Sequence, residues 1–265
     1  MDDGVYCMLC PLTMDYYRGI YHESNKAFLD TMEAWGDLAD GKLYLWYYSV
    51  NFYYYLAPYD DFDSLQENYK CAVDNGTVYL FDERQYNEYG FCNGWSNLKS
   101  YLNYKLTWDV EQSVPKLLDQ FFEGYFGPGA EDMRKYFNEF RVLNNYNLDY
   151  NELGGQNNVF KDITDEKYWP KDILTSWIEH CDAAAEKLMS LEMEEPELYE
   201  MYLNHINGEK LAALYLFIEC YSYNTSEDVL LKYKQEFKAI ATELNVFQLS
   251  AHDSISVLYE SWGIN

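Results

Sequence analysis

The sequence predicts an α/β region followed by an all-α region. Apolar runs typical of buried strands alternate with helical periods through the first hundred residues. The predicted loops after strands are long, whereas the turns from helix to strand are short, which is how barrel enzymes place an active site at the C-terminal ends of their strands. From about residue 109 no strand signal remains. We therefore expect the last βα units of a (β/α)8 TIM-type barrel, in truncated form, over residues 1–108 and an α-helical domain over residues 109–265.

The βα units follow one another in a regular order. The run VYCMLC at 5–10 predicts a strand, and residues 24–41 predict a helix with Phe28, Met32 and Trp35 on one face, Ser24 at its start and Gly41 at its end. Strands at 42–48 and 77–81 and helices at 60–76 and 94–108 repeat this unit. Such a repeat predicts a parallel sheet.

The second half of the chain is predicted to be helical. Amphipathic periods occupy residues 114–127, 130–143, 172–191, 197–221 and 226–245, with a short final helix at 253–262. An Asn- and Gly-rich linker at 144–170 divides them. We expect these helices to pack behind the sheet.

Three strands leave the predicted sheet incomplete. A barrel of this type needs eight strands, and an open parallel sheet presents an unpaired edge that proteins avoid. We therefore expect an upstream barrel half, or self-association with another copy, to cover this edge.

Charge and composition exclude several kinds of partner. The formal net charge is −26 and the pI is about 4.3, so nucleic acid and anionic membrane surfaces are not expected partners. No run is long and apolar enough to span a bilayer. The chain itself shows no export signal. A secreted or cell-surface location is expected if the chain is part of a longer exported protein.

No metal or cofactor is expected. Cys7 and Cys10 form a C-x-x-C without a second such pair, and the four histidines have no metal-ligand spacing. A glycine-rich phosphate loop and a G-x-S-x-G elbow are both missing from the sequence.

Aromatic residues are unusually common. The chain has 29 Tyr, 14 Phe and 7 Trp, or 19% aromatic residues. Tyrosine and tryptophan combine an apolar face with a polar tip, which suits the faces of sugar rings as well as protein cores. This composition favours carbohydrate as a partner.

Two neighbouring acids, Asp82 and Glu83, follow the third predicted strand. Glycoside hydrolysis needs two carboxyl groups that face the scissile bond. Because neighbouring side chains of a strand point to opposite faces, these two acids are not expected to form the pair together, but one of them is a candidate catalytic acid. The alternative is that both are solvated acids with Arg84 as their counter-ion.

Polar and aromatic residues in the loops are candidates for sugar contacts. Tyr48, Asn51 and Tyr53 lie at and after the second strand, where they are predicted either to hold a sugar or to belong to the core. Gln85 and Asn87 follow the third strand. His22 lies in the loop before the first helix, where it is predicted either to hold a sugar hydroxyl or tune a proton, or to be an ordinary surface histidine next to the Ser24 cap.

Three blocks of the sequence resemble a known family. They are YHESNKAFLDTMEAW, the run from Lys42 to Glu83 that contains LWYYSVNFYYYLAPYDDF, and the run from Asn97 to Phe140 that contains YLNYKLTWD and YFGPGAEDMRKY. Together, over roughly residues 20 to 140, they resemble a domain-of-unknown-function family of large proteins from anaerobic, often gut, bacteria. That family is similar to alpha-glucuronidases and beta-hexosaminidase-type glycoside hydrolases. The resemblance implies a barrel with a helical C-terminal region, and Glu83 matches the acid after its last strand.

The sequence thus predicts a glycoside-hydrolase-like protein that acts on or binds carbohydrate, as part of a larger polysaccharide-processing protein. In such barrels the proton-donating acid usually comes from an earlier strand, which this chain lacks. Two alternatives therefore stay open: a non-catalytic carbohydrate-binding module and a helical protein-interaction module.

Overall fold

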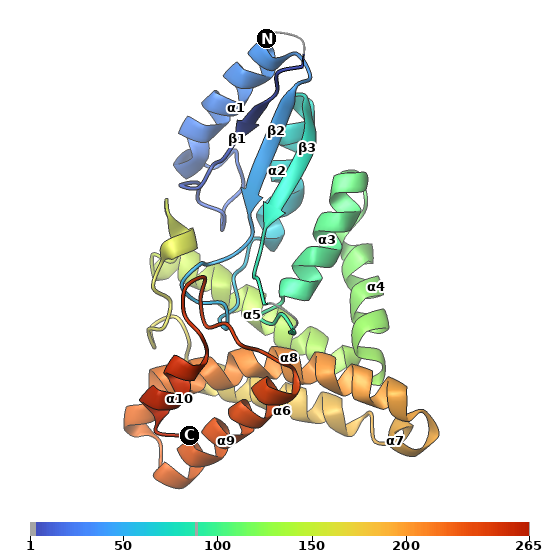
Figure 1. Cartoon of the computed structure of the whole chain (residues 1–265), viewed down its shortest axis with the longest axis vertical. Coiled ribbons are helices and arrows are strands. Elements are labelled where there is room, and N and C mark those ends of the chain that lie inside the picture. The colour runs from blue at the N-terminus through green and yellow to red at the C-terminus, as the bar shows by residue number, and fades with distance from the viewer. Residues whose placement is uncertain (1–3, 88–89, 265) are drawn as a thin grey trace.

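The computed structural model describes residues 4–87 and 90–264 of the chain (Figure 1). Within these residues, a three-stranded parallel sheet has the order β1 (Cys7–Leu9), β2 (Leu43–Tyr48), β3 (Thr77–Glu83). Helix α1 (Lys26–Ala39) connects β1 to β2, and α2 (Phe62–Asp74) connects β2 to β3. The predicted βα order of the first hundred residues is therefore present.

The two faces of the sheet differ in their environment. Leu43, Leu45 and Tyr47 of β2 are almost completely buried on the face that α1 and α2 cover. Tyr44 and Trp46 alternate with them and are half-buried on the opposite face. This alternation is the two-residue period of a strand, and it shows that helices cover one face of the sheet far better than the other.

The prediction of a TIM-type barrel portion is wrong. The sheet is open and has three strands, and the described part of the chain after Glu83 is helical apart from loops and one isolated bridge between Gln248 and Ser254. A βα repeat with short turns specifies parallel pairing between neighbouring strands, but closure into a barrel requires a full circle of strands. The local pattern alone therefore could not establish a barrel.

Helices make up the rest of the described chain. Their bounds are α3 (Ser96–Trp108), α4 (Val114–Phe126), α5 (Ala130–Tyr150), α6 (Lys171–Glu186), α7 (Leu191–Glu194), α8 (Pro196–Tyr221), α9 (Glu227–Glu243) and α10 (Ser256–Trp262), with 3-10 turns at Glu23–Asn25, Gly127–Gly129, Asn158–Phe160 and Ser222–Asn224. Figure 1 shows the sheet at one end of the molecule and α6, α8 and α9 at the other, with α5 between them. Among the described residues, no helix has the length and apolar character needed to cross a membrane.

Helix α8 is the centre of the helical part. Nearly every residue from Ile206 to Tyr221 is buried, because α6, α9 and α4 pack around it. Gly208 allows a further close contact, since a Cβ atom at this position would lie 2.2 Å from the ring of Phe91 in the loop before α3. A helix interior normally disfavours glycine, so its presence here is explained by this close approach.

Three predicted boundaries are corrected by the structure. The first helix is preceded by a 3-10 turn at Glu23–Asn25, for which His22, rather than Ser24, is the N-cap residue. Strand β3 continues through Asp82 and Glu83, which were expected to follow it. Helix α5 runs to Tyr150, so the irregular segment begins later than the predicted residue 144. The predicted division between residues 108 and 109 falls in the turn between α3 and α4 and stays a prediction.

Candidate functional site

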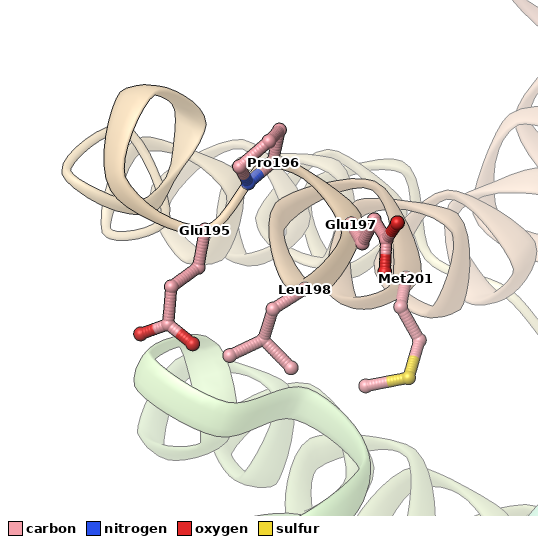
Figure 2. Close-up of a pocket in the computed structure, with 5 residues that line it drawn as sticks. All are labelled: Glu195, Pro196, Glu197, Leu198 and Met201. Carbon is pink, nitrogen blue, oxygen red and sulfur yellow. The ribbon is translucent and has the colours of Figure 1, made fainter.

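Several hollows lie on the surface of the described chain. One lies at the start of α8, and its lining contains none of the site residues predicted from the sequence (Figure 2). Another, of about 530 Å³, lies where β2 and β3 end. Residues of β2, β3, α3 and the loops between them line it: Trp46, Tyr55, Phe81, Asp82, Glu83, Arg84, Gln85, Tyr86, Cys92, Ser96 and Ser100. We call this hollow the sheet-end cleft.

An aromatic pair and a carboxylate meet in the sheet-end cleft. The rings of Trp46 and Phe81 pack edge to face with centroids 4.9 Å apart. The indole Nε1 of Trp46 donates a hydrogen bond of 2.8 Å to Oε2 of Glu83. The three side chains share a face because Trp46 pairs with Phe81 across the ladder, and Glu83 lies two residues after Phe81. The indole thus holds the carboxylate beside an aromatic surface.

Asp82 and Glu83 point to opposite faces of the sheet, as strand geometry predicts. The side chain of Asp82 is 4% exposed and lies on the helix-covered face, where Asn103 of α3 donates a hydrogen bond to it. Arg84 approaches the same carboxylate with its Nε atom at 3.5 Å. Burial raises the pKa of Asp82 to about 7, and the nearby charge of Asp61 adds to this rise.

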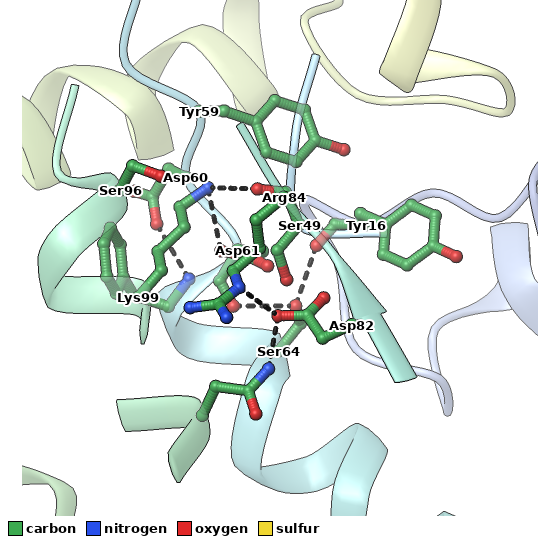
Figure 3. Close-up of polar contacts among 12 residues, drawn as sticks. Tyr16, Ser49, Tyr59, Asp60, Asp61, Ser64, Asp82, Arg84, Ser96 and Lys99 are labelled. Carbon is green, nitrogen blue, oxygen red and sulfur yellow. Dashed lines mark hydrogen bonds and ion pairs between the residues drawn. The ribbon is translucent and has the colours of Figure 1, made fainter. Parts of the chain in front are cut away.

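A buried ion pair lies next to Asp82 (Figure 3). Nζ of Lys99 lies 3.1 Å from the carboxylate of Asp61, and both side chains are at most 3% exposed. Lys99 also donates a hydrogen bond of 3.2 Å to the main-chain oxygen of Ser49 and lies 4.5 Å above the ring of Tyr59. These contacts join α3 to the loops that follow β2, so the cluster holds one wall of the sheet-end cleft in place.

Gln85 connects the cleft to the loop before α3. Its Nε2 atom donates hydrogen bonds of 2.7 Å to the main-chain oxygen of Tyr55 and 2.8 Å to Oδ1 of Asn93, and its Oε1 atom accepts one from the main-chain N–H of Asn93. Both polar atoms of the Gln85 side-chain amide therefore form hydrogen bonds within the chain. Arg84 is the positively charged residue in the lining of the sheet-end cleft, and its side chain is 28% exposed.

The residues predicted around β2 lie outside the lining of the sheet-end cleft. Tyr48 is 8% exposed and packs near Tyr16 and Trp46. Asn51 is buried, and its Nδ2 atom donates a hydrogen bond of 2.8 Å to the main-chain oxygen of Lys161. Tyr53 is 48% exposed with its ring 5.5 Å from that of Phe160. Their predicted sugar contacts stay predictions.

His22 and Asn87 also lie apart from the cleft lining. Nδ1 of His22 caps the turn by accepting a hydrogen bond from the main-chain N–H of Ser24. Asn87 bridges to the C-terminal part of the chain, since its Oδ1 atom accepts from the main-chain N–H of Phe247 at 3.1 Å. Of the predicted site residues, the structure therefore brings Asp82, Glu83 and Gln85 together.

Sequence reasoning missed Trp46, Phe81 and Arg84 as members of the site. The signal available for the two aromatic residues was the strand period, which places Trp46 on the face of Tyr48 and Phe81 on the face of Glu83. The register between the two strands, which brings the two rings together, was not visible in the sequence. In the described ranges 4–87 and 90–264, no group of three or more His, Cys, Asp or Glu side chains is arranged to hold a metal ion.

Comparison with family models places the N-terminal half of the chain. A model described as Domain of unknown function (DUF4838) matches residues 1–139, which is more than half of the chain. The chain belongs to the DUF4838 family. The predicted membership in a domain-of-unknown-function family is thereby confirmed, and the DUF4838 match contains the whole lining of the sheet-end cleft. No curated protein and no solved structure matches the chain.

Proposed function

We propose that this DUF4838 protein binds carbohydrate in the sheet-end cleft. The observation that carries the proposal is the contact between Trp46, Phe81 and Glu83, which combines an aromatic surface with a fixed hydrogen-bond acceptor. A sugar ring offers an apolar face for stacking and hydroxyl groups at its edge. Clefts that bind small ligands usually combine apolar walls with a few placed polar groups. The volume of about 530 Å³ lies within the usual range for such clefts.

Each part of the cleft has a role in this proposal. The exposed part of Phe81, 41% of the residue, stacks against a sugar ring. Glu83 accepts a hydrogen bond from a sugar hydroxyl while the indole of Trp46 keeps its carboxylate oriented. Arg84 donates to a ring or hydroxyl oxygen, and Asp82 beneath it restrains the guanidinium. The resemblance to glycoside hydrolases that the sequence predicts would favour the same class of ligand.

Binding without cleavage is the form of the proposal that the geometry favours. Glycoside hydrolysis requires two carboxyl groups on either side of the scissile bond. The acidic side chains in the cleft lining are Asp82 and Glu83, which point to opposite faces, and Asp82 is buried against α3. The predicted catalytic roles of these two acids would therefore need a second carboxyl group from outside this cleft.

The test is calorimetric titration with a panel of neutral plant and mucin oligosaccharides, together with an assay for released reducing ends. We expect saturable binding without release. Phe81→Ala and Glu83→Gln should each weaken binding at least tenfold, which corresponds to about 1.4 kcal/mol. Trp108→Ala is the matched control, because Trp108 is 91% exposed and lies outside the cleft.

Two results would contradict the proposal: no saturable heat with any sugar, or equal affinity in the wild type and both cleft variants. Release of reducing ends that is lost in Glu83→Gln would instead support the predicted hydrolase. The folded state of each variant is checked by circular dichroism before titration.

A further inference from the structure

A second surface, independent of the sheet-end cleft, runs along the first half of α8. The hollow in Figure 2 measures about 640 Å³ and is lined by Glu195, Pro196, Glu197, Leu198 and Met201. A neighbouring hollow of about 360 Å³ shares Met201 with it and adds residues of α8, the end of α9 and the loop before α3. The two hollows meet at Met201, and we call them together the α8 groove.

The floor of the α8 groove follows a single face of the helix. Leu198, Met201 and His205 are separated by three and four residues, which is the spacing of neighbours on one helical face. Figure 2 shows that the side chains of Leu198 and Met201 point to the same side of α8. From Glu195 to His205 the groove runs along ten residues, or about 15 Å of helix. This length matches two to three turns of a docked helix.

The floor is apolar and rigid at its inner end. Met201 is 41% exposed and Leu198 is half-buried, so both offer apolar surface to a partner. His205 is held by a hydrogen bond of 2.6 Å between its Nδ1 atom and the main-chain oxygen of Tyr125, and its ring stacks on that of Tyr125. Burial lowers the pKa of His205, so the imidazole is neutral and adds no positive charge.

The walls carry negative charge. Glu195, Glu197 and Glu243 belong to the lining of the two hollows, which contains no lysine or arginine. The whole chain has a formal net charge of −26, so a second copy or another acidic protein would be repelled. The complementary occupant therefore has an apolar face and basic flanks.

We propose that the α8 groove binds a basic amphipathic helix of a partner protein. Amphipathic helices bind in such grooves through apolar residues at helical spacing, and methionine side chains adapt to different partners. The apolar side chains of the bound helix contact Leu198 and Met201, while its lysine or arginine residues pair with the glutamates of the walls.

The probe for this proposal is a fluorescein-labelled peptide of about 14 residues, built from leucine and lysine at helical spacing. Its binding to the full chain is followed by fluorescence anisotropy at about 0.15 M salt, where long-range attraction is screened. A peptide of the same composition in scrambled order keeps the charge but loses the apolar face. We expect saturable binding of the helical peptide and at least tenfold weaker binding of the scrambled one.

Two variants locate the contact. The double variant with Leu198→Ser and Met201→Ser should weaken binding at least tenfold, whereas Met193→Ser should leave it unchanged, because Met193 is 90% exposed and outside both hollows. The double variant with Glu195→Lys and Glu197→Lys alters exposed positions and should also weaken binding, so the test does not depend on one variant folding. Equal binding of the two peptides, or equal affinity in all variants, would show nonspecific attraction and overturn the proposal.

Discussion

Glu209 is a carboxyl group in the buried middle of α8. It is 1% exposed, and its Oε2 atom accepts a hydrogen bond of 2.7 Å from the main-chain N–H of Trp95. Burial raises the pKa of Glu209 to about 8, although this hydrogen bond and one from the main chain of Gly94 favour the ionised form. Burial also raises the pKa of Asp60 to about 6. At neutral pH the native state therefore holds Glu209 mainly protonated, whereas Asp60, which pairs with Arg141, gains its proton only below about pH 6.

These shifts predict that stability falls as the pH rises from about 5 to about 8. The ordinary pKa of a glutamate is 4.5, so between this value and about 8 the native state binds a proton at Glu209 that the unfolded state has lost. The stabilisation is complete below the unfolded pKa and disappears as the pH passes the native one. Glu209→Gln should reduce the fall in melting temperature across this range, as measured by calorimetry at several pH values. Glu200→Gln, at an exposed position of the same helix, should keep the wild-type slope; an equal slope in Glu209→Gln would contradict the prediction.

The site illustrates at the residue scale what a sequence can predict. Glu83 could be selected because an acid at the end of an apolar strand is conspicuous. The roles of Asn51 and Asn87 could not be seen, because their partners, Lys161 and Phe247, lie more than a hundred residues further along the chain. A polar side chain in a loop looks the same in sequence whether it meets a ligand or another loop.

The sheet is the element with the most unusual surface. Tyr6, Met8, Tyr79 and Phe81 are between 41% and 50% exposed, and the rings of Tyr44 and Tyr79 lie 5.1 Å apart on the same open face. Parallel sheets are normally covered on both faces, so this face is a favourable surface for contact with other molecules. The expectation that a partner segment or another copy covers the sheet edge stays a prediction.

Removing an aromatic ring from this face should change surface properties more than stability. Tyr79→Thr keeps a β-branched residue suited to a strand, so the free energy of unfolding should change by no more than about 1 kcal/mol. The folded Tyr79→Thr variant should bind less of the dye ANS than the wild type, because ANS reports exposed apolar surface. Tyr223→Thr is the control, because Tyr223 is 71% exposed in the 3-10 turn after α8, away from the sheet. An unchanged ANS signal in Tyr79→Thr would mean that the face is covered in solution.

At the scale of the whole molecule, the loop at 151–170 joins the sheet to the helices. Asn158 is 1% exposed and accepts a hydrogen bond of 2.6 Å from the hydroxyl of Tyr59. Its Nδ2 atom donates one of 2.7 Å to Asp15, which lies in the loop after β1. The ring of Phe160 stacks on that of Phe52. The two predicted parts of the chain therefore share a buried polar and aromatic contact.

Because of this contact, we expect the chain to unfold in one transition. Asn158→Ala removes the acceptor of the Tyr59 hydroxyl and the donor to Oδ1 of Asp15, whose Oδ2 still accepts from the main-chain N–H of Gly155, and should lower the free energy of unfolding by about 3 kcal/mol. Far-UV circular dichroism and tryptophan fluorescence in a urea titration should shift together. Asn138→Ala, at an exposed position of α5, is the control and should change little. Separate midpoints for the two signals would show that the parts unfold independently.

By itself, the sequence determined the order and type of the elements, the parallel pairing of neighbouring strands and the strong negative charge. These properties depend on residues close together in the chain, through hydrophobic period, turn residues and composition. Only the tertiary structure decided that the sheet stays open, that Trp46, Phe81 and Glu83 meet, and that Asn51 and Asn87 bond to distant loops. The physical reason is that register, burial and hydrogen-bond partners depend on contacts between segments far apart in sequence, which no local pattern contains.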